Sequence, residues 1–144
     1  MTTVGNLLNI KGHEIWSITP DKSVFEALEM MAEKNVSGLL ILENDKLVGI
    51  FTERDYARKL ILKGKLSKST KVGDLMTKNI LYVETQNTIE DCMTLMTNKR
   101  VRHLPVLKSN RLIGILTIGD LVKQIISEQQ TTINQLENYI SGGY

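Results

Sequence analysis

The chain holds a single cysteine among its 144 residues, so it cannot form an intramolecular disulfide. No apolar run approaches the roughly 20 residues that a membrane-spanning helix needs. The first residues lack the basic-then-apolar pattern of a secretory signal. The net charge is only +2 and no basic cluster occurs, which gives no reason to expect nucleic acid. These absences predict a cytoplasmic protein without nucleic-acid or membrane partners.

What the sequence does contain is an internal repeat. A shift of 65 positions aligns Ile15–Tyr56 with Ile80–Leu121 without a gap, and 11 of the 42 aligned residues are identical. The best-matched stretches, Gly49–Asp55 and Gly114–Asp120, both read Gly-Ile-apolar-Thr-x-x-Asp. Each copy alone would bury too little surface for a stable domain. We therefore expect the two copies to pack on each other and share a core.

Each copy has the pattern strand, helix, strand, strand, helix. In the first copy a short strand over Ile15–Thr19 precedes a helix that a Ser-x-x-Glu capping box opens. Val36–Leu42 suits a strand buried on both faces, and Asn44-Asp45 predicts the turn of a hairpin. A closing helix is expected over about Glu53–Lys63. The second copy repeats each of these elements 65 residues later, and Cys92 falls on the apolar face of its first helix, where it should be a buried core residue rather than a reactive thiol.

Three features lie outside this plan. Pro105 cannot donate a ladder hydrogen bond, so it should lie on a sheet edge or at a bulge. Val72–Met76 echoes Val4–Leu8, which predicts a lead-in element before each copy. After the second copy, apolar residues at near-heptad spacing form a narrow seam on a helical tail, namely Ile126, Ile133, Leu136 and Ile140. We expect this tail to pack against a second subunit or another partner.

The polar residues shared by the copies are a threonine and an aspartate. Thr52 and Thr117 each stand where a strand ends and a helix begins, with Asp55 and Asp120 one turn later. On its own, Thr-x-x-Asp indicates a capping box worth about 0.5–2 kcal/mol. However, the motif recurs with its glycine and apolar positions, and such a helix N-terminus also suits a phosphate. The threonine would then bind phosphate and the aspartate would accept from ribose hydroxyls, as acids do in other nucleotide folds.

These motifs resemble those of CBS (cystathionine-β-synthase) domains. The resemblance rests on the two strand-helix-strand-strand-helix copies ending in Gly-hydrophobic-x-Thr-x-x-Asp, and on Val101–Val106, which is similar to the family's second-strand signature. It covers about residues 9–124. It implies a mixed α/β (α+β) fold, in which tandem β-α-β-β-α repeats are related by a pseudo-two-fold axis and form one Bateman-type module. Residues 9–64 and 73–125 would be the repeats and 126–144 the helical tail.

The resemblance also implies two clefts between the repeats that bind adenosyl ligands without chemical turnover. The implied ligand-binding residues are Thr52, Asp55, Arg102 and His103 in one cleft, Thr117, Asp120, Ser37 and Gly38 in the other, and Ile18, Leu39, Val83, Leu104 and Pro105 as apolar or strand positions near the adenine. Only the second copy carries Arg-His at the facing strand, and these side chains suit a phosphate. The other cleft would hold an uncharged adenosyl end, a second ligand, or nothing.

Three functions are compatible with this sequence. The first is a regulatory module that binds AMP, ATP, NAD or S-adenosylmethionine and signals to a regulated partner or through its own oligomer, which the family resemblance implies is a homodimer. The second is an interaction or oligomerisation module with vestigial clefts. The third, a nucleotide hydrolase, is disfavoured, because neither Thr-x-x-Asp motif has a second carboxylate or a His/Cys cluster nearby. We therefore expect no enzyme activity, no catalytic cofactor and no metal.

Overall fold

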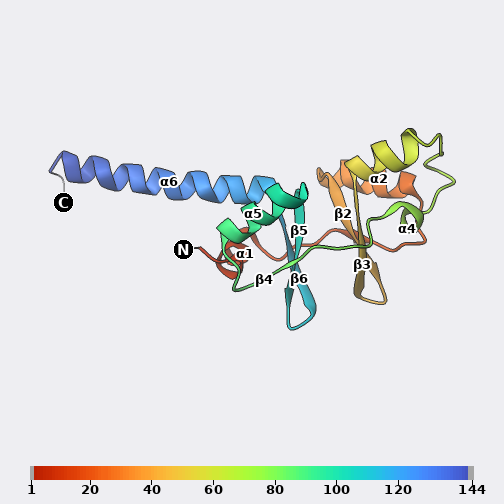
Figure 1. Ribbon diagram of the computed structural model, residues 1–144, viewed down its shortest axis with the longest axis horizontal. Coiled ribbons are helices and arrows are strands. Elements are labelled where there is room, and N and C mark those ends of the chain that lie inside the picture. The colour runs from red at the N-terminus through yellow and green to blue at the C-terminus, as the bar shows by residue number, and fades with distance from the viewer. Residues whose placement is uncertain (1, 143–144) are drawn as a thin grey trace.

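The computed structural model describes residues 2–142, so the last two residues of the predicted tail lie outside the described part. It contains two units of strands and helices, side by side, from one of which a long helix projects (Figure 1). The first repeat consists of β1 (Ser17–Ile18), α2 (Val24–Lys34), β2 (Gly38–Glu43), β3 (Lys46–Thr52), α3 (Glu53–Asp55) and the π-helix η1 (Tyr56–Ile61). The second consists of β4 (Val83–Glu84), α5 (Ile89–Lys99), β5 (His103–Lys108), β6 (Arg111–Thr117) and α6 (Ile118–Ile140). The lead-in helices are α1 (Val4–Lys11) and α4 (Val72–Leu75). The predicted mixed α/β fold with two repeats is confirmed.

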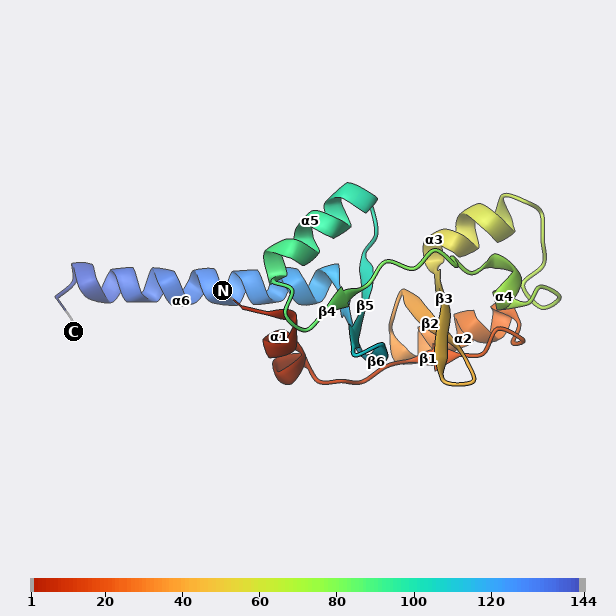
Figure 2. The ribbon, with the colours of Figure 1, turned by 60° about the horizontal axis from the view of Figure 1, so that its bottom comes forward.

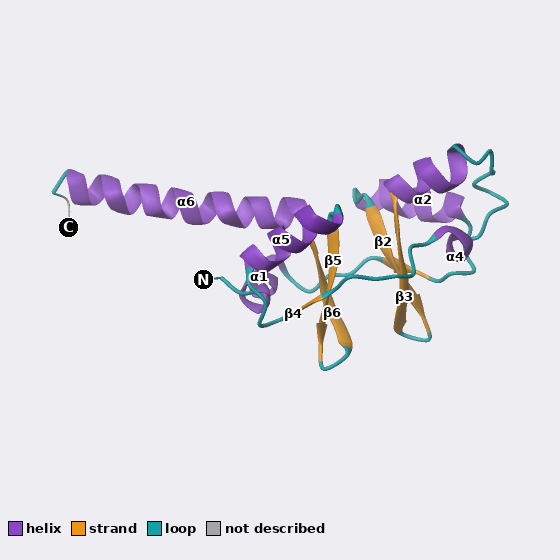
Figure 3. Cartoon of the chain, viewed as in Figure 1, coloured by secondary structure: helices purple, strands orange, loops and turns teal. Residues whose placement is uncertain are grey.

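Each repeat builds its own three-stranded sheet (Figure 3). The orders are β1-β2-β3 and β4-β5-β6, with the first pair parallel and the second antiparallel in both sheets. The predicted hairpin turns are present, and both central residues of each turn have positive φ, as in type I′ turns. In β2 and β3, Gly38 pairs with Thr52, and in β5 and β6, His103 pairs with Thr117. The start of each middle strand therefore lies beside the threonine of the Thr-x-x-Asp motif.

Pro105 lies in the middle strand of its sheet, so the prediction that it occupies an edge is wrong. The register shift in β5 follows Val106 and has a counterpart in the first repeat, where there is no proline. The ladder between β1 and β2 begins at Ser17↔Leu40, whereas the ladder between β4 and β5 begins one position later, at Val83↔Val106. The sheet accommodates the missing N–H donor by a displacement of the parallel ladder: both ladders have two pairs, but the second starts one position later and so leaves Pro105 out.

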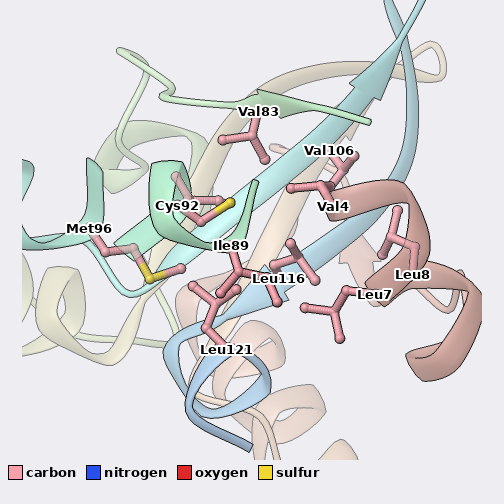
Figure 4. Close-up of a cluster of buried hydrophobic side chains, with 11 residues drawn as sticks. Val4, Leu7, Leu8, Val83, Ile89, Cys92, Met96, Val106, Leu116 and Leu121 are labelled. Carbon is pink, nitrogen blue, oxygen red and sulfur yellow. The ribbon is translucent and has the colours of Figure 1, made fainter. Parts of the chain in front are cut away.

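The two repeats do not share one core, contrary to the sequence-based expectation. The buried apolar residues form two clusters, one in each repeat. Each cluster is completed by the lead-in helix that precedes the other repeat. Val4, Leu7 and Leu8 of α1 enter the second core, as Figure 4 shows, and Val72 and Leu75 of α4 enter the first. This exchange supplies the apolar surface that each small repeat would otherwise lack.

The glycine of each motif permits this exchange. A Cβ atom on Gly114 would lie 2.8 Å from a methyl carbon of Leu8 in α1. At the equivalent Gly49, a Cβ atom would collide with the side chain of Met76, just after α4. The backbone beside Gly49 also pairs with the lead-in segment, since Ile50 and Thr77 exchange hydrogen bonds of 3.0 and 2.8 Å. The glycines therefore serve close packing of the lead-in segments.

The closing helices of the two repeats differ. In the first, α3 passes directly into the π-helix η1, and the chain leaves at Gly64 with φ of +68°. In the second, α6 is a regular helix of 23 residues that extends well beyond the rest of the molecule in both ribbon views (Figures 1 and 2). Within residues 2–142, no helix has the combination of length and apolar character that a membrane span requires.

Candidate functional site

Equivalent residues of the two repeats meet between them. Gly38 and His103 are 65 positions apart, and a Cβ atom on Gly38 would lie 3.0 Å from Nε2 of His103. The same ring nitrogen lies 3.1 Å from Oγ of Ser37. Equivalent backbone bonds flank this contact, because Glu53 donates to the carbonyl of Ser37 and Ile118 to that of Arg102, both at 3.0 Å. The contact therefore lies where the N-terminal ends of β2 and β5 face each other. Because Gly38 has no side chain, there is room for the imidazole of His103.

A cleft of about 960 Å³ opens beside this contact. Its volume falls in the range of small-molecule sites in proteins. Thr52 and Asp55 lie on its first-repeat wall, and Arg102 and His103 lie on its second-repeat wall, as the sequence predicts for one cleft. Ser37, which the family pattern places in the other cleft, also lines this one.

Asp55 is only 8% exposed and its carboxylate is fully engaged. Oδ2 accepts from the backbone N–H of Thr52 at 3.0 Å, which completes a capping box. Oδ1 accepts from the hydroxyl of Thr77 and from Nζ of Lys59, both at 3.1 Å. The capping role and a position on the cleft wall therefore coexist in one residue. Thr77 enters this site because its lead-in segment packs on the first repeat.

The equivalent place in the second repeat has a different arrangement. Asp120 also forms a capping box, accepting from the N–H of Thr117 at 2.8 Å. Its second partner is Nζ of Lys11 from α1, at 2.6 Å, and this ammonium also donates to the carbonyl of Ile115 at 2.5 Å. Each motif aspartate thus forms an ion pair with one lysine, but the two lysines are not at equivalent positions of the repeats. The second-repeat counterpart of Lys59 is Gln124. The structure does not bring Thr117 and Asp120 onto the wall of the large cleft.

The apolar positions implied for the adenine lie elsewhere. Ile18 and Leu39 belong to the first core, Val83 and Leu104 belong to the second, and Pro105 is buried in β5. None of them lines the large cleft. Its apolar wall consists instead of Ile50, Met96, Val101 and Ile118. A continuous apolar run predicts that side chains are buried, but it does not separate those that fill a core from those that border a cavity.

Besides the predicted Arg102, the cleft carries four cations that sequence reasoning missed. Its charged lining comprises five cationic residues, Arg54, Arg58, Lys59, Arg100 and Arg102, and two acidic ones, Glu53 and Asp55. Arg54 and Arg58 are four residues apart in the closing helix, a spacing that puts both on one helical face and was available as a signal. No helical spacing pointed to Arg100, because this residue ends α5 as its C-cap. The result is a site with a net positive charge.

Arg100 has a left-handed backbone conformation, with φ of 54°. Its counterpart Asn35 ends α2 with φ of 55°. Asparagine tolerates this region better than arginine does. We therefore expect Arg100→Asn to raise the free energy of unfolding by up to about 1 kcal/mol in urea denaturation. Lys99→Asn, one residue earlier and still helical, should lower the free energy of unfolding instead. Equal effects of the two variants would show that the left-handed conformation of Arg100 is not strained.

The pKa of His103 is lowered from its ordinary value of 6.5, mainly by burial and further by the charges of Lys11 and Arg102, with Asp120 opposing. The ring is therefore neutral at pH 7. Because the unfolded chain binds a proton more readily, this contribution to stability is complete above pH 6.5 and is lost as the pH falls below it.

We expect the free energy of unfolding to decrease as the pH falls below about 6.5, and His103→Gln to flatten that decrease. Urea denaturation across this pH range measures both. The chain has only one other histidine, so His13→Gln is the matched control and should leave the slope due to His103 in place. An unchanged slope in His103→Gln would show that the decrease has another source.

Two sheet-and-helix repeats with exchanged lead-in helices and a cleft between them define a paired-repeat fold. The family model for the CBS domain matches residues 9–62 and 72–127. The chain therefore belongs to the CBS domain family, and it contains two copies of the domain. The family resemblance predicted from the motifs is confirmed.

Known proteins agree with this assignment. The mitochondrial CBS domain-containing protein CBSX3 of Arabidopsis thaliana is 39% identical over 153 residues, which cover 99% of this chain and 74% of that protein. A putative signal-transduction protein with CBS domains from Burkholderia ambifaria is 45% identical, with a TM-score of 0.86 over 89% of this chain and 96% of that one. The CBS domain pair of protein MJ0100, solved in complex with 5′-methylthioadenosine and S-adenosyl-L-methionine, shares the fold at 23% identity and a TM-score of 0.77, over 89% of this chain and 98% of that one.

Proposed function

We propose that this chain is a regulatory module that binds a phosphate-bearing adenosine ligand of the AMP, ATP or NAD class in the large cleft. Ligand binding in this cleft would be signalled to a partner protein or through the oligomer of the chain itself. The observation that carries the proposal is the composition of the cleft wall. Thr52 and Asp55 of one repeat face Arg102 and His103 of the other across a cavity of about 960 Å³.

The charge of the wall favours an anionic ligand. Arg54 and Arg58 approach from the closing helix of the first repeat and Arg102 from the residue just before β5. Guanidinium groups bind phosphate oxygens through paired, charge-assisted hydrogen bonds. His103 is neutral at pH 7 because its pKa is lowered, so it contributes one donor or one acceptor and no charge. The cations would hold the phosphates, and Ile50 and Val101 offer apolar surface to the base.

Asp55 is the candidate for the ribose. Both of its oxygens already accept hydrogen bonds, including one from Lys59. A ribose hydroxyl that donates to Oδ1 would therefore displace the Lys59 ammonium. The freed ammonium, on the same wall, would then be available to the phosphate. In this proposal the lysine neutralises the buried carboxylate until the ligand replaces it.

The CBS pair of MJ0100 supports an adenosine ligand in general terms, because both compounds in that complex contain adenosine. S-adenosylmethionine carries a sulfonium cation, whereas the cleft of this chain is lined by more cations than acids. We therefore propose that the two proteins differ in the group attached to the ribose. A ligand that touches both repeats would stabilise one relative position of them, which is the physical basis for signalling.

Chemical denaturation with ATP, AMP, NAD, adenosine and S-adenosylmethionine tests this function. Phosphate-bearing ligands should stabilise most, by about 2.7 kcal/mol at 100 times the dissociation constant for one site. Asp55→Ala should abolish the effect. Asp91→Ala is the matched control, because it removes the same capping-box acid from α5, away from the large cleft. The function fails if none of the five compounds stabilises the chain.

A further inference from the structure

The second half of α6 stands apart from the molecule (Figures 1 and 2). Near its start, Leu121 is buried, Ile125 packs against the second core, and Glu128 accepts a hydrogen bond from Thr2. From residue 129 to 140 every side chain is exposed. An isolated helix of about 12 residues is marginal in water. This part of α6 therefore has little support from the fold of its own chain.

An apolar stripe runs along this projecting helix. Its members are Val122, Ile126, Ile133, Leu136 and Ile140, and they are between 41% and 82% exposed. With Gln129 they occupy successive core positions of a heptad pattern, with isoleucine at one position and mainly leucine or valine at the other. In parallel coiled coils this choice of side chains favours two strands over three or four, so it favours a pair of helices here and leaves their direction to the flanking charges. At a rise of 1.5 Å per residue, the stripe is about 27 Å long.

We propose that α6 pairs with α6 of a second copy of this chain in an antiparallel coiled coil centred on Thr131. In this register Ile126 packs against Leu136 of the second copy, and Val122 against Ile140 of the second copy. Gln129 meets Ile133 of the second copy at the middle. Every layer is matched by its two-fold equivalent, as a closed symmetric dimer requires.

Charge complementarity selects the antiparallel direction. Lys123 and Glu137 flank the stripe, and within residues 2–142 neither side chain forms an ion pair or hydrogen bond. The antiparallel register brings Lys123 beside Glu137 of the second copy, and it does so twice. A parallel pair would instead bring Lys123 beside Ile118 and Glu137 beside Thr132 of the second copy, with no opposite charges. A second copy therefore satisfies both the apolar stripe and its flanking charges.

The oligomeric state gives the first test. Analytical ultracentrifugation should show a dimer for the full chain, and Ile133→Asp should raise the dissociation constant by more than about 100-fold, because each helix would bury a charge in the seam. Thr131→Asp carries the same substituent on the opposite face and should leave the dimer intact. A monomeric wild-type chain, or a dimer unaffected by Ile133→Asp, would overturn the proposal.

Charge reversal gives a second, independent test. Lys123→Glu and Glu137→Lys should each weaken the dimer roughly tenfold, because each creates two like-charge contacts. The double variant should restore the wild-type dissociation constant, since the two pairs are re-formed with reversed signs. Additive weakening in the double variant would overturn the proposed register.

Disulfide trapping decides the direction of the helices. A tagged Gln129→Cys chain mixed with an untagged Ile133→Cys chain should form mainly mixed disulfide dimers if the helices are antiparallel. Cys92 does not interfere, because it is buried and its thiol pKa is raised to about 11. Disulfides formed only between identical variants would indicate a parallel pair and overturn the proposal, as would the absence of any disulfide under oxidising conditions.

Discussion

Replacing Leu8 with alanine is expected to lower the free energy of unfolding by about 2–5 kcal/mol. Leu8 has no exposed surface, and it belongs to the same buried cluster as Leu116 and Leu121 of the second repeat. Alanine would leave a cavity against Gly114, which has no side chain with which to fill it. Domains of this size have only about 5–15 kcal/mol of stability in total, so the loss is a large fraction of it.

Ile10→Ala is the control for this substitution. Ile10 lies on the same helix and is 70% exposed, so its replacement should cost less than about 0.5 kcal/mol. Urea denaturation measures both variants. Hydrogen exchange should also show that Leu8→Ala weakens protection in the second repeat more than in the first, although the helix is adjacent in sequence to the first. Equal costs at Leu8 and Ile10 would contradict the exchange of lead-in helices.

That exchange marks a limit of the sequence. The echo between Val4–Leu8 and Val72–Met76 predicts that a lead-in element precedes each repeat, and both elements are present as helices. It does not indicate which core each helix enters, because the two segments have similar apolar patterns and the two motifs have the same glycine. The choice depends on chain connectivity and packing, and these appear only in three dimensions. For the same reason, the sequence suggested one shared core where the structure has two.

The candidate site was predictable to a similar extent. Periodicity and the repeated Thr-x-x-Asp motif located Thr52 and Asp55, and the family resemblance placed Arg102 opposite them. Lys59 and Thr77 were missed because their contacts with Asp55 depend on η1 and on the exchanged lead-in segment. Residues brought together by tertiary packing leave little trace in local sequence patterns.

Removing the guanidinium of Arg102 is expected to lower the affinity for AMP and ATP by about 10- to 100-fold, because a hydrogen bond to a charged group contributes about 1.5–3 kcal/mol. Arg102 is exposed just before β5 and lines the same cleft as Arg54 and Arg58. The variant Arg102→Gln keeps a polar side chain at that place but no charge. Isothermal titration calorimetry with both nucleotides measures the change.

Two controls make this expectation specific to the phosphate. Arg111→Gln removes the same charge from the exposed first residue of β6, outside the cleft, and should leave affinity nearly unchanged. Adenosine lacks the phosphate, so its affinity should differ by less than about threefold between wild type and Arg102→Gln. Arg102→Lys should recover only part of the loss, because an ammonium cannot form the paired bonds of a guanidinium. An equal loss for adenosine and AMP would show that Arg102 supports the cleft or the base, and phosphate recognition would then fall to Arg54 and Arg58.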